Sequence, residues 1–202
     1  MPIFLDDQPI ASVGRSLSEV LSSTTDHLAR RGRVVVEIQV DGENLTGDEL
    51  QAHSNSAIED GEVRLYSANP RVWAHSTITA LRTELDQAAD LQARAADLLH
   101  RDSPSKAMLL LTKILEIWQQ TQQGIACSVN LIGVDWNKLQ IARKPLPARI
   151  TELTQQFKTV HDAIEANDST TLAAWLGHQW PEIADHWHKM LNDVIELIDQ
   201  KG

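Results

Sequence analysis

The stretch RVVVEIQVDG, residues 33–42, decides the fold class of this chain, because it is the clearest strand in it. Apolar residues stand at every second position, which is the period of a strand with one face turned to a core. Asp41-Gly42 then forms a turn signal. The pattern predicts a strand from Arg33 to Asp41. The side chains expected on its buried face are Val34, Val36, Ile38 and Val40.

Shorter elements are predicted on both sides of this strand. Two short strands, 3–5 and 9–11, flank an acidic turn at Asp6-Asp7. Ser16 and Glu19 have the spacing of a capping box, which predicts a helix that ends near Gly32. A second capping box over residues 46–49 predicts a short helix over 47–52, and a last strand follows over 62–67. We therefore expect a small sheet crossed by one helix.

This order of elements resembles the ubiquitin-like β-grasp fold over residues 1–69. The resemblance rests on the order of two strands, a helix, a strand, a short helix and a last strand, and on no motif. Modifiers and sulfur carriers of that fold end in a free Gly-Gly tail, whereas Ala68-Asn69-Pro70 follows the last strand here and the chain continues. The resemblance implies a fold, and we expect neither conjugation nor sulfur transfer.

The residues after Pro70 predict helices and no strand. Apolar residues recur at helical spacing over 72–100, 104–132, 150–164 and 183–198, and Asp168 or Ser169 caps a short helix before the last of these. A helix break is expected between Gly177 and Pro181. Each apolar stripe needs cover from its neighbours, so a four-helix bundle is the natural packing. We expect an α+β protein with a β-grasp-like domain over 1–70 and an all-α, four-helix-bundle-like domain over 71–202.

The charge is unevenly divided along the 202 residues, whose net charge is -10. Residues 1–70 hold 5 Lys and Arg against 12 Asp and Glu, and residues 71–202 hold 13 against 16. An acidic chain lacks the positive field that general nucleic-acid binders and proteins held on anionic lipid need. No apolar run approaches about 18 residues, and no basic region precedes an apolar run at the start. We expect no membrane span, no signal peptide and a cytoplasmic location.

The sequence offers few residues with the spacing of a chemical site. Glu182 and His186, four residues apart on the last predicted helix, are the pair with the spacing of metal ligands. A third ligand at matching spacing is missing, so we expect no metal and no other cofactor. Cys127 lies in an apolar helical stretch, where we interpret it as a buried packing residue and not as a nucleophile. We expect no catalytic residue in this chain.

One basic cluster surrounds the Pro-rich link before the third long helix. It consists of Arg143, Lys144 and Arg149. These side chains either hold an acidic partner or form a solvated loop, and we favour the loop.

The six tryptophans all lie at or after residue 73, and they give the candidate binding residues. Three of them fall on apolar stripes and are expected in the core: Trp118, Trp175 and Trp187. The other three lie at the domain junction, in a polar loop and in the expected helix break: Trp73, Trp136 and Trp180. An aromatic side chain with a polar tip at such places often lines a groove or an interface, with local packing as the alternative.

These observations favour a non-enzymatic protein–protein interaction module, such as a scaffold, adaptor or chaperone-like protein. Helical bundles bind amphipathic helices in grooves, and β-grasp sheets expose edges or faces to other chains. The expected partner is another protein chain, with a basic surface or an amphipathic helix, and a homodimer is a variant of the same class. The alternative is an enzyme or small-ligand binder with its site in the cleft between the domains.

Overall fold

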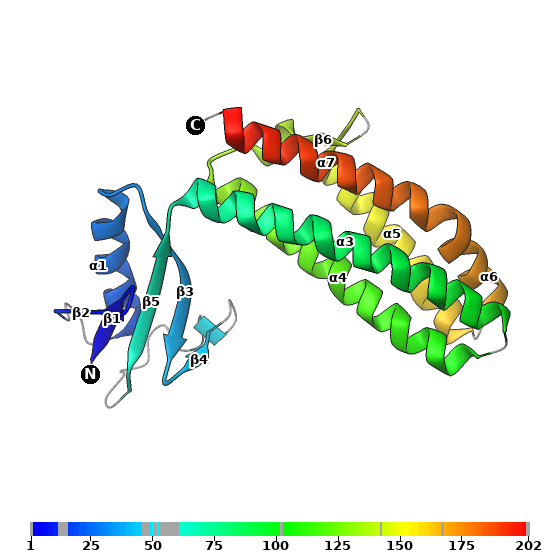
Figure 1. Ribbon diagram of the computed structural model, residues 1–202, viewed down its shortest axis with the longest axis horizontal. Helices are drawn as coiled ribbons and strands as arrows, with labels where there is room; N and C mark the ends of the chain where they lie inside the picture. Colours follow the sequence, from blue (N-terminus) through cyan, green and yellow to red (C-terminus); the bar gives the residue numbers. More distant parts are fainter. Residues whose placement is uncertain are drawn as a thin grey trace. The chain divides into compact units, whose positions relative to one another are not determined.

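The structure is a computed structural model that describes residues 2–11, 16–45, 49–50, 52, 61–101, 103–141, 143–166 and 168–200 (Figure 1). The chain separates into two compact units, residues 1–73 and 74–202, and the division falls in the first turn of a helix. None of the helices in the described ranges combines the length and the apolar character that crossing a membrane requires.

The first unit is a sheet with one helix. Its strands are β1 (Ile3–Leu5), β2 (Gln8–Ile10), β3 (Val34–Val40), β4 (Glu43–Asn44) and β5 (Val63–Ala68), and its helix is α1 (Leu17–Ala29). The strands lie in the order β2-β1-β5-β3-β4, with β1 parallel to β5 and the other pairs antiparallel. Leu17 and Val20 of α1 are buried against Ile3, Val63 and Leu65 of the sheet. The predicted α+β class, with a small β-grasp-like sheet at the N-terminal end, is confirmed.

The strand that decides the fold contains a β-bulge that its sequence pattern hides. β3 pairs with β5 through Val35, skips Val36 and resumes at Glu37. The extra residue moves the following side chains to the other face. The β3 side chains that pack against the core are Val35, Ile38 and Val40. The predicted buried face is therefore wrong before the bulge, where Val35 takes the place of Val34 and Val36, and right beyond it.

Helix α1 begins and ends where the sequence predicts. The Ser16 hydroxyl accepts a hydrogen bond from the Glu19 N–H at 3.3 Å. Gly32 adopts a φ of 64°, and its N–H donates to the carbonyl of Ala29, as expected of a glycine that ends a helix. Of the short helix predicted over 47–52, residues 49, 50 and 52 are described and helical, and most of its capping box lies outside the described residues.

The second unit is helical, with four long helices in the part that the structure describes. These are α3 (Pro70–His100), α4 (Pro104–Leu131), α5 (Leu146–Glu165) and α7 (Trp180–Gln200). Asn69 starts α3 by accepting a hydrogen bond from the Arg71 N–H at 3.0 Å. In Figure 1, α3 and α4 run side by side from the short link at their ends, and α5 and α7 complete the bundle. The all-α, four-helix-bundle-like part of the prediction is confirmed.

The link between α4 and α5 contains two strands that were not predicted. A turn of 3-10 helix, η1 (Trp136–Lys138), is followed by β6 (Gln140–Ile141) and β7 (Lys144–Pro145), which pair antiparallel. The expectation of no strand after Pro70 is therefore wrong. A strand of two residues is too short to show alternation, so the sequence gives no periodic signal for it.

The expected helix break between Gly177 and Pro181 is also wrong. The short helix α6 (Ser169–Ala174) continues through a π-helical turn, η2 (Trp175–Gln179), directly into α7. The Trp180 N–H donates to the carbonyl of Trp175, five residues back. A proline in an ordinary helix clashes with the carbonyl four residues back, and the wider turn before Pro181 lets the chain stay helical.

The predicted apolar stripes form the core of the second unit, with two corrections on α4. Ile114 is buried and Leu115 is only partly so, one position away from the predicted stripe. Cys127 is exposed and its neighbour Ser128 is buried, so the expectation of a buried cysteine is wrong. A stripe assigned at steps of seven drifts around a straight α-helix, which explains errors of one position.

Four tryptophans meet in the centre of this core. Trp118 of α4 lies edge-on to Trp180 and Trp187 of α7, with ring centroids 5.0 Å and 5.6 Å apart. Trp175 lies 4.1 Å from Trp180, and Phe157 of α5 lies 5.7 Å from it. Trp118 and Trp180 are both 0% exposed. Trp180 is therefore a packing residue that joins α4, α5 and α7.

We expect Trp180→Ala to lower the free energy of unfolding by about 3–5 kcal/mol, because it leaves a cavity among the rings of Trp118, Phe157 and Trp175. Trp180→Phe keeps most of the packing, and it should cost less than about 1.5 kcal/mol. Denaturation in urea, followed by circular dichroism, measures both values. A loss below about 1 kcal/mol for the alanine variant would show that Trp180 is not a core residue.

Candidate functional site

The three tryptophans that the sequence proposed as binding residues differ in what the structure says of their exposure. Trp73 is half-buried and is the last residue of the first unit. The backbone of Trp136 forms the start of η1, and its side chain lies outside what the structure describes. Trp180 is fully buried and has no surface to offer to a partner. Trp73 and Trp136 therefore stay predictions as binding residues.

The metal-ligand pair is not completed by a third residue. Glu182 is exposed and His186 half-buried, both on α7. Within the described ranges, no group of three or more His, Cys, Asp or Glu side chains is placed to hold a metal ion. The pair has the helical spacing of two ligands, and the fold brings no further ligand to it in those ranges.

The basic cluster before α5 is largely neutralised within the chain. Lys144 donates to Glu152 at 2.5 Å, and Arg149 donates to the other oxygen of the same carboxylate at 2.8 Å. Arg143 is exposed in the turn between β6 and β7, with a φ of 65°. Two of the three cations are therefore held by α5, which supports their interpretation as a structural loop.

Some charges of the first unit are also paired with one another. Asp6 accepts from the Ser67 N–H at 2.7 Å and lies 3.4 Å from the Arg33 guanidinium, and Asp7 lies 2.8 Å from Arg64. Burial works to raise the pKa of Asp6, but the hydrogen bonds from Ser67 and Arg33 outweigh it and the pKa is lowered.

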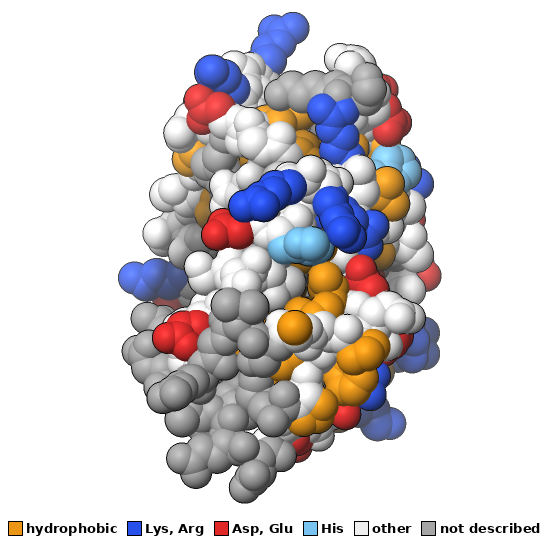
Figure 2. Space-filling model, turned by 90° about the vertical axis from the view of Figure 1, so that its left-hand side faces the viewer, with side chains coloured by type: hydrophobic (Ala, Val, Ile, Leu, Met, Phe, Trp, Pro, Cys, Tyr) orange, Lys and Arg blue, Asp and Glu red, His pale blue; other side chains and the backbone are white. Residues whose placement is uncertain are grey.

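Figure 2 looks onto the side that carries α1, where basic side chains flank a histidine above a group of hydrophobic ones. This side of the acidic unit does not present a uniform negative surface.

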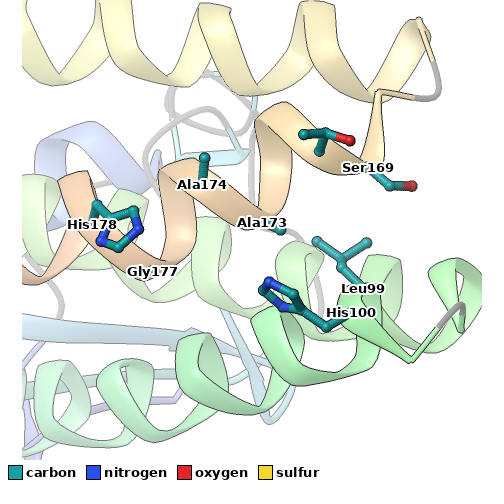
Figure 3. Close-up of a pocket in the computed structure, with 8 residues that line it drawn as sticks. Leu99, His100, Ser169, Ala173, Ala174, Gly177 and His178 are labelled. Carbon is teal, nitrogen blue, oxygen red and sulfur yellow. The ribbon is translucent and has the colours of Figure 1, made fainter.

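One cavity of the second unit lies between the end of α3 and the α6–η2 segment. It has a volume of about 540 Å³. Figure 3 shows the imidazoles of His100 and His178 on its two walls, around Gly177, with Ser169 toward the other end. The Nδ1 of His100 lies 2.7 Å from the carbonyl oxygen of Ala96, which can only accept, so Nδ1 is the donor of this hydrogen bond. The cavity thus offers two imidazoles beside an apolar floor.

A longer groove follows the outer side of the α3–α4 pair. It consists of two adjoining cavities of about 530 and 610 Å³, which share Arg94, Lys113 and Glu116. Its α3 side is formed by Gln87, Asp90, Leu91, Arg94 and Leu98. Its α4 side is formed by Lys106, Leu109, Leu110, Thr112, Lys113, Glu116, Ile117 and Gln120. These positions repeat at three or four residues on both helices, so the groove runs along the helices rather than across them.

Aliphatic side chains line the groove along its whole length. They are Leu91, Leu98, Leu109, Leu110 and Ile117. Leu109 is 69% exposed, which is unusual for a leucine that is not at the end of a helix. Four of the five pack partly against the bundle core, whereas Leu109 stands away from it. The groove therefore combines partly buried aliphatic residues with a leucine that is mostly exposed.

The groove is rimmed by charges of both signs. The cations are Arg94, Lys106 and Lys113, and the carboxylates are Asp90 and Glu116. All five side chains are exposed. An apolar floor with a polar, charged rim is the composition of a protein-binding surface.

Comparisons with protein-family models, with characterised proteins and with solved structures find no match to this chain.

The sequence contains a signal for the groove that lies in its leucines and not in its tryptophans. Leu91 and Leu98 lie seven residues apart on α3, and Leu110 and Ile117 lie seven apart on α4. These pairs form a second apolar stripe beside the one that builds the core. A second stripe on both helices of one pair predicts an outer face that another chain can cover.

We expect Glu152→Gln to lower the free energy of unfolding at pH 7 by less than about 1 kcal/mol, because the carboxylate is 40% exposed. The hydrogen bond from Lys144 and the charge of Arg149 lower the pKa of Glu152. A carboxyl with a lowered pKa stabilises the fold above its unfolded pKa of about 4.3, and this contribution is lost as the pH falls through the folded pKa. The difference between variant and wild type should therefore vanish in acid.

Urea denaturation at neutral pH and at about pH 3 checks this dependence. Glu182→Gln, at an exposed carboxylate that no ion pair holds among the described residues, is the control and should change little at either pH. A Glu152 effect that persists unchanged in acid would contradict the assignment.

Proposed function

We propose that this protein is a non-enzymatic protein–protein interaction module whose helical unit binds an amphipathic helix of another protein in the α3–α4 groove. The observation that carries the proposal is the apolar end of the groove, formed by Leu98, Leu110 and exposed Leu109. Helices that bind in grooves insert apolar side chains at positions i, i+3 or i+4, and i+7, and the groove residues repeat at the same spacing. A cytoplasmic location remains part of the proposal.

The length of the groove suits a helix of ordinary size. α3 rises about 16 Å from Gln87 to Leu98, and α4 rises about 21 Å from Lys106 to Gln120. A partner helix of about three to four turns would cover this distance. The surface it buries would be small, and such interfaces are typical of reversible rather than permanent complexes.

A second candidate function, binding of a small ligand, is favoured by the cavity beside His100 and His178. The sequence predicted a ligand site in the cleft between the domains. This cavity lies within the second unit, to which all of its lining residues belong. A small-molecule library screened by thermal shift tests it. Stabilisation that is lost in His178→Ala would favour this function over helix binding.

We expect Leu109→Lys to weaken capture of the native partner at least about tenfold, because a charged ammonium would displace the leucine from an apolar floor. Val72→Lys is the matched control, since Val72 is the other large hydrophobic residue that is exposed in the described part of the chain, at 66%. Affinity capture from the native cell lysate, quantified by mass spectrometry, compares both variants with the wild type.

Both substitutions replace exposed side chains, so the free energy of unfolding should stay within about 0.5 kcal/mol of the wild type. Equal capture by all three proteins would place the interaction outside the groove and would end the proposal.

A further inference from the structure

We propose that the helix bound in the groove is acidic along both of its polar edges, an inference that rests on the proposed function. The reason lies in the cations of the groove. Arg94 from α3 and Lys113 from α4 line both of its cavities, and Lys106 lines the cavity nearer the α3–α4 link. A helix seated on the leucines would therefore lie between basic residues of both walls.

Some cations of the same unit are held in ion pairs, whereas these three are not, among the residues that the structure describes. Arg101, Lys138 and Lys189 each lie within 4.0 Å of a carboxylate on their own helix or turn. Among the described residues, no carboxylate lies that close to Arg94, Lys106 or Lys113. Arg94 has Asp90 four residues before it, and Lys113 has Glu116 three residues after it, yet neither pair is closed. The groove lining holds three cations and two carboxylates, so its net charge is positive in a chain with 28 acidic and 18 basic residues.

A helix that covers the groove removes water from these cations. A partly desolvated cation without a counter-charge destabilises the complex, and one that gains a carboxylate is compensated. Acidic residues at the edges of the partner would supply that charge. A basic helix would place like charges together, which costs affinity.

A second copy of this chain fits the groove less well. Each copy would bring three cations and two carboxylates to the interface, so cations would remain in excess on both sides. Each copy also carries a net charge of -10, which opposes association at low salt. An acidic helix of another protein matches every cation without adding any.

The test uses two synthetic peptides of about five helical turns with identical leucines at i, i+3 or i+4, and i+7. One carries Glu at the edges of the leucine stripe and the other carries Lys, two residues of similar helix propensity. Each labelled peptide is titrated with the full chain and followed by fluorescence anisotropy. We expect the Glu peptide to bind at least about tenfold more tightly than the Lys peptide, and the difference to shrink as salt is added.

The double variant Arg94→Glu/Lys113→Glu should reverse this preference, and Arg94→Gln/Lys113→Gln should abolish it. All four substitutions are at exposed positions, and circular dichroism confirms that the variants fold. Equal binding of both peptides would overturn the acidic partner and leave the proposed groove function standing. Binding of neither peptide would overturn the groove function itself. Concentration-dependent dimers in sedimentation that Leu109→Lys abolishes would make a second copy the occupant and overturn the acidic partner.

Discussion

The helical unit depends on the edge-to-face packing of Trp118 against Trp180 and Trp187. These rings join the middle of α4 to α7, and each of them buries a large apolar area in the core. Because Trp118 is fully buried, the side of α4 that carries it must face inward. The opposite side of α4, with Leu109 and Lys113, is then turned outward beside α3. The position of the groove is thus a consequence of the core.

The described part of the chain uses its charged residues in two ways. In the first unit, Arg64 lies 4.7 Å above the ring of Phe4 and pairs with Asp7 and Glu62, so one cation holds three neighbours. In the second unit, the groove cations have no such partner among the described residues, although carboxylates stand nearby on the same helices. Both units contain paired cations, and among the described residues those of the groove are left available for recognition. Together with the apolar floor, these cations favour a partner in the groove.

Local rules predicted most helices and strands, because caps, turns and apolar periods act within a few residues. The errors arose where one residue changes the register of everything after it. The bulge at Val36 exchanges the faces of β3, and the π-helical turn before Pro181 brings Trp180 into the core. The groove was missed because each helix was given one apolar stripe. Leu91 and Leu98 belong to a second apolar stripe, which forms a groove only where α3 and α4 lie side by side.

The central claim is that the outer side of α3 and α4 is covered by a partner in the working protein. Hydroxyl-radical footprinting of the protein alone and in its native complex measures this directly at individual side chains. Leu109, at 69% exposure, should be labelled strongly in the free protein and weakly in the complex, together with Leu98 and Leu110. Unchanged labelling of these three leucines, with protection confined to other surfaces, would contradict the account.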